Sequence, residues 1–176
     1  MAAMTDGPPR RDQVLATALE VFVRFGYRKT SMDDVAQAAE ISRPGLYFLF
    51  ASKQELFRAA VVRALEADLA AAESALSAYE KPETQRLLEA FDHWTGRYLG
   101  AMTRDLPAVL EENPTQLSGL ADEYPRRFAA LIEDALGNPD LAQTLISAAI
   151  GIKHQVGTRE EFRARMEVAI RVIAER

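Results

Sequence analysis

The sequence predicts an all-α protein, and three observations support this fold class. Apolar residues recur at spacings of three and four, and no segment alternates apolar and polar residues as a strand does. Alanine, the best helix former, occurs 30 times in 176 residues, against 9 glycines and 8 prolines. Residues that cap helices precede several of the apolar segments.

About nine helices are expected. Ser31, Ser42 and Asn138 each stand one position before a predicted first turn, and Ser52 with Glu55 forms a capping box. Glycine or proline ends or interrupts most of the helical segments. The expected helices span residues 10–25, 32–39, 43–49, 53–79, 83–102, 104–112, 115–136, 139–155 and 159–173.

Composition excludes several classes of protein. The absence of cysteine rules out disulfide scaffolds, thiolate metal sites and cysteine nucleophiles. His93 and His154, the only histidines, stand far apart without a carboxylate-rich spacing, so neither a metal nor another cofactor is expected. No apolar stretch approaches the roughly 20 residues of a membrane span. Residues 1–9 are expected to form a disordered arm and not a signal peptide, which points to a cytoplasmic protein without a membrane partner.

The net charge conceals an asymmetry along the chain. With 21 Lys and Arg against 26 Asp and Glu, the charge is -5, which by itself argues against a nucleic-acid partner. Residues 1–60, however, hold eight cations and seven anions, so this part carries +1 and the remainder -6. The two parts are therefore expected to have different partners.

Two short helices joined by a tight turn predict a helix-turn-helix between residues 32 and 49. The turn lies at Glu40 and Ile41, and the second helix is one that a DNA major groove accommodates. Val35, Ala36, Ile41, Leu46 and Phe50 stand where the helices must pack on each other. The residues left facing outward are Arg43, Pro44, Gly45, Tyr47 and Phe48.

Residues 10–57 closely resemble the tetracycline-repressor (TetR) family of bacterial transcription regulators. The matching elements are Thr30-Ser31, Asp33-Asp34, Val35-Ala36, Ile41-Ser42, Leu46-Tyr47, Phe50, Ser52-Lys53 and Leu56. The resemblance implies a helix-turn-helix DNA-binding domain at residues 10–57 and an effector-binding and dimerisation domain at 58–176. It also implies a homodimer on a pseudo-palindromic double-stranded operator, with repression as the default and no enzymatic activity. One departure is Phe48-Leu49, where the family often has an aromatic or histidine pair and where Leu49 cannot donate to phosphate.

The outward residues then divide by chemistry. By the family pattern, the residues that contact phosphate are Thr30, Ser31, Tyr47 and Lys53. Arg43 is the candidate for base reading, because a guanidinium can bind guanine O6 and N7 together. Pro44 and Tyr47 are suited to thymine methyl groups, and Gly45 permits close approach of the backbone to DNA. Phe48 either stacks on a sugar of the DNA backbone or packs against the following helix.

Beyond residue 60 the resemblance is weak, and the residues themselves suggest an effector pocket. Aromatic residues and a methionine recur at helical spacing, as in apolar ligand sites, although for any single residue a simple core explains them as well. The pocket set is Phe91, Trp94, Tyr98, Met102, Tyr124 and Phe128. Polar residues suited to orient an unknown small-molecule effector are His93, Arg97, Asn113 and Gln116.

The last two helices are the expected dimer surface. One carries a stripe of small residues and the other a long apolar stripe, and two such helices from each chain would form a four-helix bundle. The predicted interface consists of Thr144, Ser147, Ala148, Gly151, Phe162, Met166, Ala169, Ile170 and Ile173. Val168 and Val172 widen the apolar stripe beyond what one neighbouring helix would bury.

Two readings without DNA binding stay open at this point. An all-helical enzyme or carrier would use the aromatic pocket, but no nucleophile–base pair, metal cluster or phosphate loop supports it. An all-helical protein-interaction module would use the exposed pair Tyr47 and Phe48.

Overall fold

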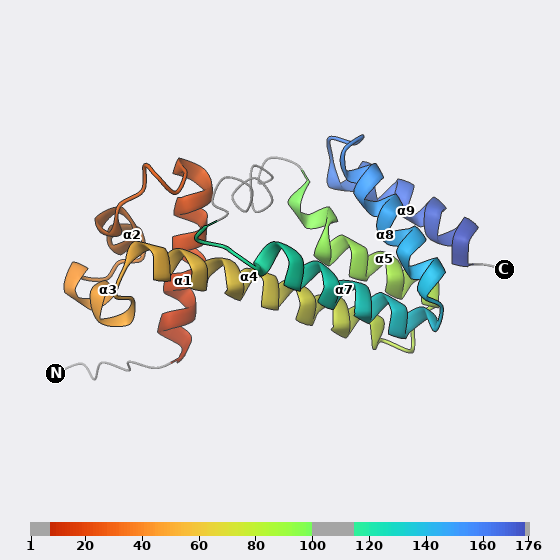
Figure 1. The fold of residues 1–176 in the computed structure, drawn as a ribbon, viewed down its shortest axis with the longest axis horizontal. Coiled ribbons are helices and arrows are strands. Elements are labelled where there is room, and N and C mark those ends of the chain that lie inside the picture. The colour runs from red at the N-terminus through yellow and green to blue at the C-terminus, as the bar shows by residue number, and fades with distance from the viewer. Residues whose placement is uncertain (1–7, 100–114, 175–176) are drawn as a thin grey trace. The chain divides into compact units, whose positions relative to one another are not determined.

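The computed structural model describes residues 8–99 and 115–174, and every regular element in these ranges is a helix, which confirms the all-α prediction. No helix in these ranges has both the length and the apolar character needed to cross a lipid bilayer. The elements are α1 (Pro8–Phe25), α2 (Met32–Ala38), α3 (Arg43–Leu49), α4 (Lys53–Leu76), α5 (Glu83–Trp94), the 3-10 helix η1 (Gly96–Tyr98), α7 (Leu120–Leu136), α8 (Pro139–Lys153) and α9 (Arg159–Ala174) (Figure 1).

Two helices differ from their predicted bounds by more than three residues. The helix predicted over 83–102 ends at Trp94 and continues as η1, whose Gly96 packs against α9. The helix predicted over 115–136 begins at Leu120, because Gly119 has a φ of +83°, a left-handed conformation that an α-helix cannot contain. The helix predicted over 104–112 lies outside the described residues.

The chain divides into two compact units, which we describe separately. The first unit comprises residues 1–65 and 104–118, and the second comprises residues 66–103 and 119–176. The division falls within α4, so the first turns of this long helix belong to one unit and its remaining turns to the other.

The core of the first unit is built around three fully buried phenylalanines. Phe22 from α1 meets Phe57 from α4 edge-on, with ring centroids 5.0 Å apart. Phe50, which caps the C-terminus of α3, is also fully buried, as are Val35 of α2 and Leu46 of α3. Because this core takes side chains from all four helices, it fixes how α3 is presented to solvent.

The turn between α2 and α3 closes with the hydrogen bonds of a Schellman motif. The Ile41 N–H donates to the Ala36 carbonyl at 3.0 Å, and the Glu40 N–H donates to the Gln37 carbonyl at 3.2 Å. Glu40 has a φ of +53°, in the left-handed region that a non-glycine residue seldom adopts. Ser42 then caps α3, since its hydroxyl accepts from the Gly45 N–H at 3.1 Å. The tight turn predicted at Glu40 and Ile41 is therefore present.

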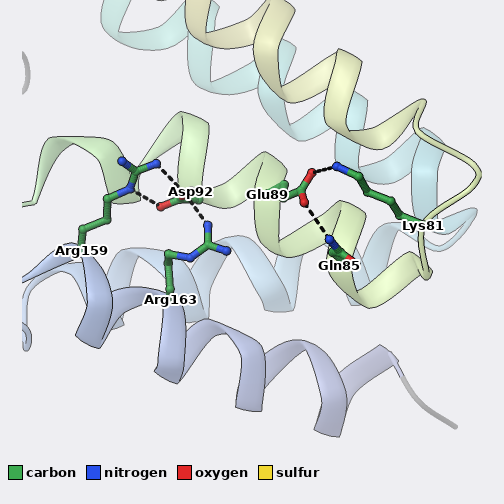
Figure 2. Close-up of polar contacts among 6 residues, drawn as sticks. All are labelled: Lys81, Gln85, Glu89, Asp92, Arg159 and Arg163. Atoms are coloured by element: carbon green, nitrogen blue, oxygen red, sulfur yellow. Dashed lines mark hydrogen bonds and ion pairs between the residues drawn. The ribbon is translucent and has the colours of Figure 1, made fainter.

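In the second unit, α9 packs against α5 and α8, and a buried carboxylate ties α5 to α9. Figure 2 shows Asp92 of α5 between two arginines of α9. Arg159 donates to both carboxylate oxygens of Asp92, at 2.9 and 2.7 Å, and Arg163 donates at 2.5 Å. A Cβ on Gly96 would lie 2.9 Å from a ring carbon of Phe162, so the close approach of η1 to α9 requires glycine.

The pKa of Asp92 reflects this environment. Burial by itself raises the pKa, but the hydrogen bonds and positive charges of Arg159 and Arg163 outweigh burial, and the net pKa lies below the ordinary value. Asp92 is therefore ionised at neutral pH.

Candidate nucleic-acid interface

One face of α3 consists of side chains that the fold leaves in solvent. Leu46 is fully buried, whereas Arg43 and Pro44 are exposed and Tyr47 keeps 42% of its surface. Phe48 is 84% exposed, so its ring does not pack against α4 or the rest of the first unit. Of the two alternatives for Phe48, packing against the following helix is therefore not what the structure shows. An exposed aromatic pair beside an arginine is the kind of surface that a partner covers.

Arg43 stands at the first position of α3 and is held by two neighbours. Its Nε lies 3.0 Å from a carboxylate oxygen of Asp33 in α2, and its guanidinium carbon lies 5.7 Å from the centroid of the Tyr47 ring. The sequence placed Asp33 only in the acidic first turn of α2 and did not indicate this pairing, because the two residues are ten positions apart on different helices. Gly45 lies next to the cap, where a Cβ would come within 3.0 Å of the Ser42 hydroxyl. The absence of a Cβ at Gly45 therefore also leaves room for the Ser42 hydroxyl that caps α3.

The predicted phosphate contacts occupy different environments. Ser31 is exposed and caps α2, since its hydroxyl accepts from the Asp34 N–H while its own N–H and hydroxyl both donate to the Asp34 carboxylate at 2.7 Å. These bonds lower the pKa of Asp34. Thr30, in contrast, is only 3% exposed, and its hydroxyl donates to the Gly26 carbonyl at 2.9 Å. A phosphate contact by the Thr30 hydroxyl would therefore require this turn to open.

Lys53 closes the turn between α1 and α2 from the other side. Its ammonium donates to the carbonyl oxygens of Tyr27 and Thr30, both at 3.0 Å, and lies 4.4 Å from the Tyr27 ring centroid. Two of its three N–H groups are thus used inside the protein. The sequence suggested only the phosphate role, because neither the carbonyls nor the ring of Tyr27 could be placed without the fold.

We expect Lys53→Met to lower the stability of the first unit by about 2 kcal/mol, since two hydrogen bonds from a charged group are lost at a half-buried position. The same change should weaken binding to all duplex DNA, and should reduce the slope of log K against log salt by about 0.9 if the ammonium also neutralises a phosphate. Thermal unfolding and salt-dependent gel shifts measure the two effects. Lys29→Met, at an exposed lysine of the same turn, is the control. Unchanged thermal stability of Lys53→Met would contradict the structural role.

The N-terminal unit matches a known family. The sequence model described as "Bacterial regulatory proteins, tetR family" matches residues 14–60, which contain α2, α3 and the start of α4. The HTH-type transcriptional regulator TcmR of Streptomyces glaucescens is 30% identical over 160 residues, which cover 91% of this chain and 67% of TcmR. The chain belongs to the TetR family.

Two further likenesses agree with this membership. The HTH-type transcriptional activator FasR of Mycolicibacterium smegmatis is 48% identical over 54 residues, which is 31% of this chain but only a quarter of FasR. The crystal structure of a TetR-family transcriptional regulator from Mesorhizobium loti superposes with a TM-score of 0.78 at 16% identity, covering 96% of each chain. The protein is thus a TetR-family transcriptional regulator with a helix-turn-helix DNA-binding domain.

The residues predicted to border an effector pocket in this TetR-family protein pack against one another. Phe128 of α7 stacks on Trp94 with centroids 5.0 Å apart and meets Phe91 edge-on at 5.3 Å. Phe91 and Phe128 are buried, and Trp94 is half-buried. The hydroxyl of Tyr124 donates to Glu66 of α4 at 2.7 Å. Four of the six pocket residues thus lie in one region between α4, α5 and α7, and Met102 lies outside the described residues.

Tyr98, the remaining described member of that set, is half-buried and bonds a buried acid. Its hydroxyl and the guanidinium of Arg97 both bond the carboxylate of Asp68, which is completely buried on α4. Burial raises the pKa of Asp68 to about 6, although the Tyr98 hydroxyl and the Arg97 charge both lower it. Sequence reasoning missed Asp68, because an acid within an alanine-rich helix gives no sign of facing inward.

The polar residues suggested for the effector are dispersed. Arg97 pairs with Asp68, and His93 is half-buried on α5. Gln116 belongs to the first unit, where its backbone carbonyl accepts from Arg58 at 3.1 Å. Asn113 lies outside the described residues.

The predicted dimer residues divide into two layers. Phe162, Met166 and Ile170 are fully buried within their own chain, so they support the surface of α9 from beneath and do not form it. The reason is that α9 carries apolar side chains on more than one face, and this row packs against α5 and α8. Ala169 and Ile173 do line the outer surface.

On α8, the predicted stripe of small residues faces outward. Thr144 and Ser147 are exposed, whereas Ala148 and Gly151 are half-buried. A Cβ at Gly151 would meet nothing within 4 Å. The residue expected to allow close helix approach therefore has open space beside it.

Proposed function

We propose that this protein binds a pseudo-palindromic DNA operator as a homodimer, represses transcription, and is released by a small-molecule effector. In this proposal residues 10–57 form the DNA-binding domain and residues 58–176 the effector-binding and dimerisation domain. The observation that carries it is the outward face of α3. There the side chains of Arg43, Tyr47 and Phe48 are exposed and lie outside the core of the first unit. A two-fold dimer presents two such helices about 34–36 Å apart, one turn of duplex DNA.

A small part of this face is proposed to recognise the base sequence of the DNA. Arg43 is proposed to bind guanine O6 and N7, and Pro44 and Tyr47 to contact thymine methyl groups. Ser31, Tyr47 and the third N–H of Lys53 are proposed to contact phosphates, which position the protein without specifying sequence. Phe48 is proposed to stack against the sugar of one nucleotide. The backbone at Gly45 is proposed to approach the DNA closely.

The dimer surface is supported by an exposed apolar groove. The groove is shallow, has a volume of about 620 Å³, and is lined by six residues of α9 and by Ile152 of α8. Val168 and Val172 are 57% and 73% exposed, and Ile150 on α8 is 55% exposed. The apolar residues of the groove are Ile152, Ala164, Val168, Ala169, Val172 and Ile173. A second copy of this surface, brought up by a two-fold axis, would bury these side chains in a four-helix bundle.

Val168→Glu is expected to convert the dimer into a monomer at micromolar concentration, because it places a charge in the centre of the proposed interface. Folding of the single chain should be preserved, since Val168 is exposed in it. Size exclusion with light scattering measures the mass, and circular dichroism confirms the helical content. Ala130→Glu, at an exposed position of α7, introduces the same charge as a control. A dimeric Val168→Glu variant would place the interface elsewhere.

Effector release is assigned to the aromatic region of the second unit. A molecule that inserts beside Trp94 and Phe128 must separate or extend a packed ring stack. It thereby acts on α7, whose Tyr124 hydroxyl bonds Glu66 of α4. Since α4 also begins in the first unit, a shift of this helix offers a route from the effector to α3. Quenching or enhancement of Trp94 fluorescence by a compound that also releases DNA supports this assignment. Release without a Trp94 response argues for another site.

The proposed operator function is tested by selecting bound fragments from random duplex DNA. The expected result is enrichment of a two-fold symmetric motif whose half-sites are one duplex turn apart. A reporter gene placed behind that motif distinguishes repression from activation. Enrichment of no motif would contradict sequence-specific binding by this chain.

A further inference from the structure

The pairing of Asp33 with Arg43 is the feature from which we infer a further specificity residue. The two side chains come from α2 and α3 and meet across the helix-turn-helix, with 3.0 Å between the Arg43 Nε and one Asp33 oxygen. Both are exposed, at 64% for Arg43 and 57% for Asp33. A surface ion pair of this kind adds little stability. Any effect of the ion pair therefore arises from how it orients the Arg43 guanidinium.

The other acid of the same turn has a separate task. Asp34 receives the N–H and the hydroxyl of Ser31, and so completes the capping box of α2. Asp33 takes no part in this cap, and its ion pair is with Arg43. Capping therefore does not account for Asp33, although a carboxylate in a first turn is favoured by the helix dipole.

The ion pair lies at one end of the Arg43 guanidinium. The ion pair with Asp33 is made at Nε, which is the base of the guanidinium. The two terminal nitrogens remain, and together they form the planar fork that matches O6 and N7 of guanine. The Tyr47 ring, 5.7 Å from the guanidinium carbon, limits movement on another side. Within the described residues, the guanidinium is thus paired at its base, and its fork is available for guanine.

We propose that Asp33 is a positioning residue for base recognition, directing the terminal fork of Arg43 to guanine. This inference rests on the proposed reading of guanine by Arg43. The carboxylate also repels phosphate, so it makes pairing of Arg43 with the DNA backbone less favourable in non-specific complexes. Loss of Asp33 should therefore reduce discrimination between bases and increase affinity for random DNA. A residue that merely maintained the fold would lower both affinities together.

The test is a double-mutant cycle with Asp33→Ala, Arg43→Ala and the double variant, using the full chain. Each is titrated with the selected operator and with the same duplex carrying 7-deazaguanine, which lacks the N7 acceptor, at the half-site guanine. We expect the preference of the wild type for guanine to fall about tenfold in Asp33→Ala, within the range for one bidentate contact. Affinity for random duplex should rise about twofold to threefold on removal of one repelling charge. In the Arg43→Ala background, Asp33→Ala should leave the preference unchanged.

Two controls separate the proposal from its rivals. Glu20→Ala removes an exposed negative charge from α1 of the same unit and should leave guanine preference unchanged. Asp33→Asn preserves the side-chain shape, so it shows the same loss even if Asp33→Ala is poorly folded. Full retention of the preference in both Asp33 variants overturns the proposal. If Arg43→Ala itself keeps the wild-type preference, the assignment of base reading to Arg43 fails instead, and the proposal fails with it.

Discussion

Replacing Asp92 by asparagine is expected to lower the free energy of unfolding by about 3 kcal/mol, although the change alters the side-chain shape very little. The buried carboxylate accepts from Arg159 and Arg163, as Figure 2 shows, and asparagine offers neither the charge nor the second acceptor oxygen. This loss of free energy of unfolding is at the low end of the range for breaking a buried ion pair, because both arginines are partly exposed and can be hydrated. Chemical denaturation followed by circular dichroism measures it.

The difference between wild type and Asp92→Asn should depend on pH in one direction. The pKa of Asp92 is lower in the folded protein than its ordinary value, so the folded state holds the proton less tightly than the unfolded chain. The contribution of the carboxylate is therefore complete above about pH 4, the unfolded value, and is lost as pH falls through the folded pKa. The free energies of unfolding of wild type and Asp92→Asn should therefore approach each other as the pH is lowered. A constant difference down to pH 2 would contradict ionic stabilisation by Asp92.

Asp134→Asn is the matched control for this prediction. Asp134 is an exposed aspartate on α7 of the same unit, and its substitution should change the free energy of unfolding by less than about 0.5 kcal/mol. A comparable loss in both variants would indicate a general charge effect and not the connection between α5 and α9.

Replacing Arg43 by alanine is expected to cost about 1–3 kcal/mol of discrimination at one base pair of each half-site. The physical reason is that no other cation stands on the outward face of α3, whose remaining residues are Pro44, Gly45, Tyr47 and Phe48. The ratio of affinities for operator and scrambled duplex is the measurement. Affinity for scrambled DNA should also fall, since Asp33 is left facing the DNA without its partner.

Arg28→Ala is the control for Arg43→Ala. Arg28 is an exposed cation in the turn before α2, and its loss should weaken operator and scrambled duplex by the same factor. An unchanged affinity ratio in Arg43→Ala would show that another residue reads the sequence.

Local signals predicted where several helices begin. Helix starts depend on one side chain and the few residues after it, so Ser31, Ser42 and Asn138 cap the helices that the sequence indicated. The confirmed all-α class follows from composition and periodicity, which are likewise local. What the sequence left open was the direction of single side chains. The 84% exposure of Phe48 depends on how α3 and α4 meet, and no short-range pattern contains that information.

Contacts between distant residues were beyond the reach of the sequence. The partners of Asp92 lie 67 and 71 positions away, and Lys53 bonds carbonyls 23 and 26 positions before it. The predicted dimer stripe of α9 mixed buried and outer residues, because a helix packed on two neighbours is apolar around much of its circumference. The negative total charge was misleading for a similar reason. It averages a near-neutral DNA-binding part with an acidic remainder.

Methylation protection tests most directly the central claim that Arg43 on α3 reads guanine in the operator. Wild-type protein is mixed with the selected operator, and dimethyl sulfate then reports access to each guanine N7. The account predicts that one guanine N7 in each half-site is protected by the wild type and becomes accessible with Arg43→Ala, at protein concentrations that still occupy the DNA. Protection that is identical in the two proteins, or absent from the wild-type complex, would contradict the account.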